Sequence, residues 1–129
     1  MVAWNGMDRR RFPRVSFPCL ITVKESKEGK DHLLTHTENV GVGGVCIVVK
    51  KEFKMFMPVT LELDLLDGDE HVKCSAKVVW SIRRRVDEQD KPAFFDIGIE
   101  FIDLETKDLN RLEIIIQRLV KSGKTVPYR

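Results

Sequence analysis

The chain has 129 residues, of which 43% are hydrophobic and 33% charged, a profile that predicts one folded domain and excludes a disordered chain. The formal net charge is only +2, so bulk charge does not favour a nucleic-acid coat protein. No apolar run approaches the roughly 20 residues that cross a bilayer, and no signal peptide is visible, so we expect a cytoplasmic protein.

A dense basic run lies ahead of the first apolar stretch. Residues 8–14 read DRRRFPR and hold four arginines against one aspartate: Arg9, Arg10, Arg11 and Arg14. Such a run is typical of a solvated tail, a nucleic-acid patch or a clamp for a particular anion. We place a short N-terminal tail at residues 1–8 and a single domain over residues 9–129.

Six stretches have the apolar, β-branched or alternating pattern of strands, with turn residues between them. They cover residues 15–24, 32–40, 45–49, 59–66, 71–83 and 94–102. Pro18 suits an edge strand or a bulge. Alternation in the fifth stretch puts six side chains on one face: Val72, Cys74, Ala76, Val78, Trp80 and Ile82. The spacing predicts a mainly β domain, an antiparallel barrel or sandwich, over about residues 14–102.

The end of the chain changes to a helical period. Between about residues 105 and 122, apolar side chains recur at steps of three and four: Leu109, Leu112, Ile116, Leu119 and Val120. Asp103 or Thr106 is the expected N-cap, and Gly123 the expected stop. The apolar face of this helix must bury against an open barrel end or a partner subunit, so we expect a monomer or a homodimer.

Residues with catalytic or metal-binding chemistry form no recognisable pattern. The three histidines do not pair with cysteines at zinc-finger spacing, and no Ser/His/Asp set is recognisable. Cys19, Cys46 and Cys74 lie among apolar neighbours and are expected to be buried, reduced thiols. We therefore expect neither an enzyme nor a resident cofactor or metal.

The sequence GVGG at residues 41–44 follows the second predicted strand. It is not a phosphate-binding P-loop, because no helix follows it and no Gly-Lys-Ser/Thr is present. Glycines allow a tight connection with positive φ, and Asn39 adds a short polar side chain just upstream. Such a surface lets a flat ligand approach the backbone closely.

Two motifs, taken together, resemble the PilZ family. The pattern Arg-x-x-x-Arg is present as RRFPR at residues 10–14, and Asp/Asn-x-Ser-x-x-Gly as NVGVGG at residues 39–44. Later stretches are similar to that family as well: AKVVW at residues 76–80, GIEF at residues 98–101 and the terminal helix. The resemblance covers about residues 8–120 and implies a six-stranded antiparallel PilZ-type β-barrel with a C-terminal α-helix.

The resemblance implies binding of cyclic di-GMP, a dinucleotide with two phosphates and two guanines. The candidate site residues are Arg9, Arg10, Arg14, Asn39, Gly41, Gly44 and Trp80. Arginine suits this ligand, because its guanidinium donates paired hydrogen bonds to phosphate oxygens or to guanine O6 and N7. It also stacks on purines. Trp80 is either a wall for a base or a core residue.

One position departs from the motif. Gly41 stands where the family pattern has serine, so a hydroxyl that would lie against the ligand is missing. The loss of one hydrogen bond typically costs about 0.5–1.5 kcal/mol, a few-fold to tenfold in affinity, which weakens binding without abolishing it.

The expected mechanism is a switch. The arginine segment precedes the first predicted strand and has few apolar anchors, so it is expected to be mobile without ligand. Bound dinucleotide would order it against the 39–44 turn and present a new surface to a separate, unidentified partner protein.

Two rival interpretations stay open. In the first, a PilZ-like domain has lost the ligand and is a protein-interaction module, which makes its contacts through the terminal helix or through Phe53 and Phe56. In the second, residues 9–14 and 83–85 line a nucleic-acid groove, which the low net charge and the few aromatic residues disfavour.

Overall fold

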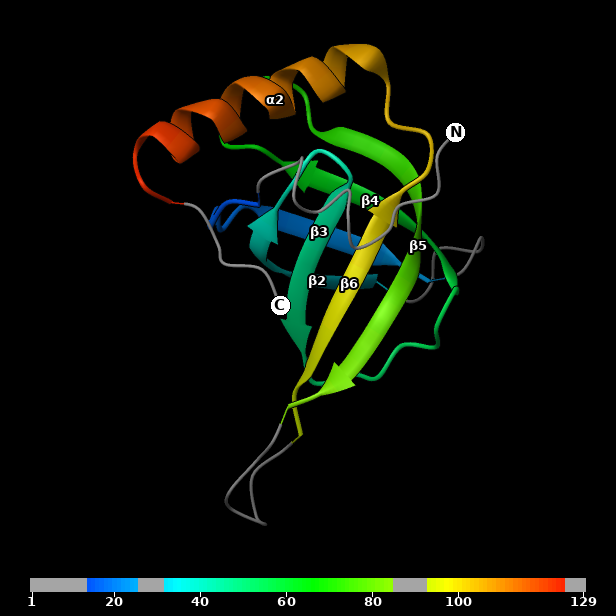
Figure 1. Ribbon diagram of the computed structural model, residues 1–129. Helices are drawn as coiled ribbons and strands as arrows, with labels where there is room; N and C mark the ends of the chain where they lie inside the picture. The colour runs from blue at the N-terminus through cyan, green and yellow to red at the C-terminus, as the bar shows by residue number, and fades with distance from the viewer. Residues whose placement is uncertain (1–13, 26–31, 85–92, 125–129) are drawn as a thin grey trace.

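The computed structural model describes residues 14–25, 32–84 and 93–124, drawn in colour in Figure 1. Its elements are β1 (Leu20–Lys24), β2 (His32–Val40), β3 (Gly44–Val49), β4 (Pro58–Asp64), β5 (Val72–Arg83), β6 (Phe95–Phe101) and α2 (Thr106–Lys121). The strands close into a barrel in the order β1-β2-β3-β6-β5-β4, and every neighbouring pair is antiparallel. The predicted six-stranded antiparallel barrel with a C-terminal helix is therefore confirmed.

The barrel interior is filled by alternate side chains of its strands. In β4, for example, Val59, Leu61 and Leu63 are buried, while the residues between them are exposed or half-buried. Because successive residues of a strand point to opposite faces, this alternation puts branched aliphatic side chains inside a closed barrel. The core is one contiguous apolar cluster, so a ligand site is expected on the outside of the barrel.

The first strand begins later than the sequence predicts. Residues 15–19 are not part of β1, and Val15 makes only an isolated bridge with Val40. Pro18 has no N–H to donate, so it interrupts regular pairing. The hydroxyl of Thr37 on β2 bonds the backbone on both sides of the proline instead.

The alternation predicted for β5 is right up to Val78 and wrong beyond it. A register shift between Val78 and Trp80 inserts an extra residue opposite β6. A bulge of this kind re-aims the side chains that follow it. As a result Trp80 lies outside the core cluster and Ile82 is 58% exposed, so the interpretation of Trp80 as a core residue is wrong.

The helix α2 lies across one end of the barrel, as Figure 1 shows. Leu112 and Ile116 are buried in the same core cluster as the strand residues, so the apolar face of α2 packs on its own barrel. The helix ends near Gly123 as predicted. Gly123 has φ 78°, and the N–H groups of Gly123 and Lys124 bond carbonyls of the last helical turn.

The N-terminal cap of α2 differs from the prediction. Glu105 is the N-cap residue and makes no side-chain cap hydrogen bond, while Thr106 is already the first helical residue. Asp103 bonds elsewhere, since its Oδ1 accepts from the Ser75 N–H of β5 at 2.5 Å. Asp103 therefore bonds the backbone of β5 and does not cap the helix.

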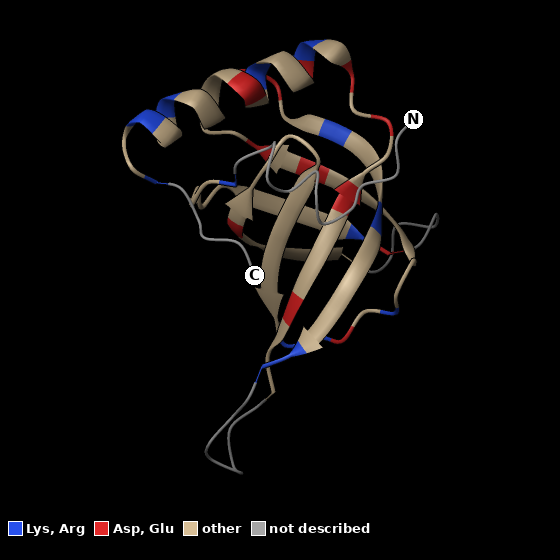
Figure 2. Ribbon diagram, viewed as in Figure 1, with Lys and Arg blue, Asp and Glu red and all other residues tan. Residues whose placement is uncertain are grey.

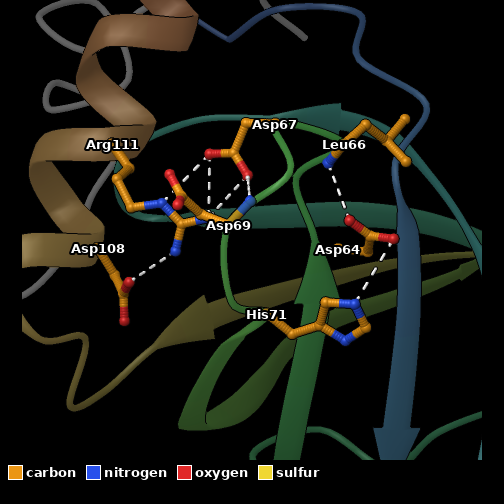
Figure 3. Close-up of polar contacts among 7 residues, drawn as sticks. All are labelled: Asp64, Leu66, Asp67, Asp69, His71, Asp108 and Arg111. Atoms are coloured by element: carbon orange, nitrogen blue, oxygen red, sulfur yellow. Dashed lines mark hydrogen bonds and ion pairs between the residues drawn. The ribbon is translucent and has the colours of Figure 1, made fainter.

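An ion-pair network fastens α2 to the β4–β5 turn (Figure 3). Arg111 donates from Nη2 to both oxygens of Asp67, at 2.9 and 3.0 Å, and from Nη1 to Asp108 at 3.0 Å. Desolvation acts to raise the pKa of Asp67, but hydrogen bonds from Arg111 and from the Asp69 N–H outweigh it, so this pKa is lowered. The turn is thus part of the helix attachment.

The three cysteines, Cys19, Cys46 and Cys74, are free and buried, as the sequence predicts. Burial, reinforced by the charges of Asp103 and Asp108, raises the pKa of Cys74 to about 12. We expect these thiols to resist a disulfide reagent at pH 8 until the chain is unfolded, because all three are buried and burial raises the pKa values of Cys19 and Cys74. Thiol titration before and after adding guanidinium measures this. A thiol that reacts at once in native buffer would contradict it.

Candidate functional site

Arg14, the last residue of the first motif and the only one of that motif that is described, meets the second motif on the outside of the barrel, where the β2–β3 turn lies next to β6. A shallow surface depression, with an enclosed volume of only about 10 Å³, is present there. Its lining comes from the segment before β1, from the β2–β3 turn and from β3, β5 and β6. The lining residues are Arg14, Gly43, Gly44, Val45, Val79, Trp80, Gly98, Ile99 and Glu100.

Two glycines allow the close approaches that shape this depression. A Cβ on Gly44 would lie 2.1 Å from the carbonyl oxygen of Ile99, so glycine is what lets β3 and β6 come this close. A Cβ on Gly98 would lie 2.2 Å from the Trp80 ring. The indole therefore packs directly on the backbone of β6 and forms one wall of the depression.

Arg14 and Asn39 are hydrogen-bonded although they lie 25 positions apart in the sequence. The bridge between Val15 and Val40, with two N–H···O bonds of 2.9 Å, brings their segments together. Arg14 Nε then donates to Asn39 Oδ1 at 2.6 Å. Because guanidinium only donates, this contact turns the amide oxygen of Asn39 toward Arg14 and leaves its NH₂ group facing elsewhere.

The β2–β3 turn is held by backbone hydrogen bonds. The Gly41 N–H donates to the Gly44 carbonyl at 2.9 Å, and the Phe101 N–H donates to the Gly43 carbonyl at the same distance. Gly41 is buried and lies outside the lining of the depression. Its backbone closes the turn that presents Gly43 and Gly44.

Four of the seven predicted site residues come together: Arg14, Asn39, Gly44 and Trp80. Gly41 lies in the adjoining turn. The contacts predicted for Arg9 and Arg10 lie outside the described residues. Sequence reasoning missed Gly98 and Glu100. Both belong to the GIEF stretch that contributed to the resemblance, and their alternate positions on one strand were a signal that they share its outer face.

Positive charge is absent from β3 and β6, two of the strands that line the depression. β3 has no charged residue, and β6 carries the acidic Asp96 and Glu100 (Figure 2). Arg84, at the other end of β6 from Glu100, pairs with Asp96 at 2.9 Å and with Glu38 at 3.4 Å, and the hydrogen bond to Asp96 raises its pKa. The described residues therefore do not join Arg14 and Arg84 into the single basic groove that the nucleic-acid interpretation needs.

The two phenylalanines predicted as partner contacts differ in exposure. Phe53 is buried in the core, so its prediction as a contact is wrong. Phe56 is 65% exposed, in a turn where it has φ 64°. Of the two, Phe56 is therefore the residue available to a partner.

Within the described ranges, no group of three or more His, Cys, Asp or Glu side chains is placed to hold a metal ion. No helix of the same ranges is long and apolar enough to cross a membrane.

Fold and depression together define a small antiparallel barrel domain in which an arginine ahead of the first strand faces a glycine-rich turn. The PilZ domain model matches residues 8–120. The chain therefore belongs to the PilZ domain family. A comparison with curated proteins gave no match.

Solved structures share the fold. The PilZ domain of YcgR from Escherichia coli with c-di-GMP has 15% identity and a TM-score of 0.66, over 89% of this chain and 94% of that one. The Bacillus subtilis inhibitor of motility MotI/DgrA has 15% identity and a TM-score of 0.67, over 88% and 52%. The K. pneumonia MrkH–c-di-GMP complex has 21% identity and a TM-score of 0.66, over 90% and 53%. The chain thus spans about half the length of MotI/DgrA and MrkH.

Proposed function

We propose that this domain is a cyclic di-GMP effector that binds the dinucleotide in the depression between the β2–β3 turn and β6. The observation that carries the proposal is the Arg14–Asn39 hydrogen bond of 2.6 Å at the edge of this depression, which unites the two family motifs. Related support comes from two solved structures of the same fold, the YcgR PilZ domain and MrkH, which contain c-di-GMP.

The chemistry of the depression suits a flat, anionic ligand. Arg14 offers a permanently charged guanidinium for a phosphate or for the O6/N7 edge of guanine. The half-buried Trp80 offers an aromatic surface for a base. Gly43 carries no side chain that would keep a purine away from the backbone.

Arg9 and Arg10 are proposed to close over the ligand from the segment ahead of Arg14. Arg14, the first described residue of this segment, lines the depression and immediately precedes the Val15–Val40 bridge. Phosphate charge would neutralise these arginines and order the segment, and the ordered segment would be the surface that a separate downstream protein recognises.

Calorimetric titration of the chain with cyclic di-GMP, with GTP as the control ligand, tests this proposal. We expect saturable binding of the dinucleotide alone. Arg14→Ala should weaken it about 10- to 100-fold, the usual value of a charge-assisted contact. Arg118→Ala is the matched control, since Arg118 is exposed on α2. Absence of binding to the unaltered chain would reject the proposal. The interpretation as a protein-interaction module, which the missing hydroxyl at Gly41 favours, would then replace it.

A further inference from the structure

Glu100 lines the depression but has no role in the motifs. In the barrel it lies opposite Gly44 of β3 and Lys77 of β5. It follows Gly98 by two positions on β6, so both residues face outward, toward the Trp80 side of the strand. Glu100 is half-buried, and no hydrogen bond or ion pair engages its carboxylate in the part of the chain that the structure describes.

Side-chain acceptors are scarce around the depression. Arg14 and Trp80 carry N–H groups that only donate. The amide oxygen of Asn39 is already engaged by Arg14. Among the described lining residues, the others are glycine, valine or isoleucine, so Glu100 is the one whose side chain can accept a hydrogen bond.

We propose that Glu100 recognises the N1–H and N2–H₂ edge of a guanine that lies against Trp80, and thereby makes the site specific for guanine. This inference rests on the proposed binding of cyclic di-GMP. A carboxylate has two acceptor oxygens side by side, and this edge of guanine has two donors side by side. Adenine presents a lone pair at N1, which the carboxylate would repel, so the same residue accepts one base and rejects the other.

The carboxylate is compatible with an anionic ligand because positive charge flanks it. Lys77 is its cross-strand neighbour on β5, and Arg14 lines the same depression. Lys77 Nζ lies 6.0 Å from the centroid of the exposed Phe56 ring, outside the lining of the depression, so it adds positive charge to this region of the surface and does not contact Glu100. Arg14 would hold a phosphate while Glu100 selects the base.

Titration of the wild type and of Glu100→Gln with cyclic di-GMP and with cyclic di-AMP tests the inference. Glutamine keeps the size of the side chain but replaces one acceptor by an NH₂ donor. We expect cyclic di-GMP affinity to fall about 10- to 100-fold, the usual worth of a bidentate base contact. Cyclic di-AMP affinity should stay equal or rise, because an amide offers the donor and the acceptor that adenine needs. Glu113→Gln, on the exposed face of α2, is the matched control.

The outcomes separate the two proposals. A wild type that binds neither dinucleotide overturns both. A wild type that prefers cyclic di-GMP, with a Glu100→Gln variant that keeps the same affinity and the same preference, overturns the role of Glu100 alone. Thermal unfolding verifies that each variant is folded. If the glutamine variant is not, Glu100→Asp serves instead, and the expected result is weaker cyclic di-GMP binding with the preference over cyclic di-AMP retained.

Discussion

Gly44→Ala is expected to destabilise the barrel by about 3 kcal/mol or more, at the upper end of what overpacking usually costs. The added Cβ would lie 2.1 Å from the carbonyl oxygen of Ile99 and 3.1 Å from the Cα of Glu100. Both are backbone atoms of β6, so no side-chain rotation relieves the clash. The β3–β6 ladder must open at the point where it also carries the depression.

Urea and thermal unfolding of the variant measure this cost. For a chain of this size, we expect the midpoint to fall by roughly 10 °C. Gly68→Ala is the matched control, since it adds the same atom where nothing lies within 4 Å and only the φ of 81° opposes it, at a cost of about 1 kcal/mol. Equal destabilisation of the two variants would show that β3 and β6 separate easily at Gly44.

The sequence predicts the strands well where one face is core and the other is solvent. β2 begins and ends where its residue pattern predicts, at residues 32 and 40, and β4 alternates as expected up to Asp64. In such strands each side chain has one favourable face, so local hydrophobicity determines both the strand and its orientation. The closed barrel then follows from six such strands and an amphipathic helix.

The errors occur where a partner strand decides the outcome. The bulge after Val78 depends on the register of β5 against β6, which no residue of β5 encodes alone. β1 starts late where the hydroxyl of Thr37 on β2 accepts from the Cys19 N–H and donates to the Phe17 carbonyl, on either side of Pro18. Asp103 accepts a hydrogen bond from β5 and does not cap α2, whose N-cap residue, Glu105, makes no side-chain cap hydrogen bond. Periodicity reports the environment of a segment but not its neighbours in space.

The candidate site could be assembled from the sequence only through family resemblance. Nothing in the spacing of Arg14 and Asn39 says that they touch; the Val15–Val40 bridge is what brings them together. The sequence does not single out Glu100, because an acidic residue on an alternating strand is ordinarily a solvated one. Only the structure places Glu100 in a depression whose other described lining residues have no side-chain acceptor, and this placement is the reason to propose a role for it.

Gly98→Ala is expected to displace the Trp80 ring, because its Cβ would lie 2.2 Å from the ring carbon Cε2 and 2.3 Å from Nε1. We expect a loss of stability of about 1–3 kcal/mol, the usual cost of overpacking. The neighbour is here a side chain, so removal of the ring should remove the clash. In a Trp80→Ala background, the same Gly98→Ala change should therefore cost little, or even stabilise the strand.

Urea unfolding of the wild type, the two single variants and the double variant gives the interaction energy of this cycle. An interaction energy of about 1 kcal/mol or more between the two substitutions would show that the absence of a side chain at Gly98 allows the indole ring of Trp80 to pack on β6. The seated indole is also the proposed wall for a guanine, so Gly98→Ala should weaken cyclic di-GMP binding about as much as Trp80→Ala does. Additive stabilities would mean that the ring moves aside freely, and a wall that moves aside freely could not position a base for Glu100.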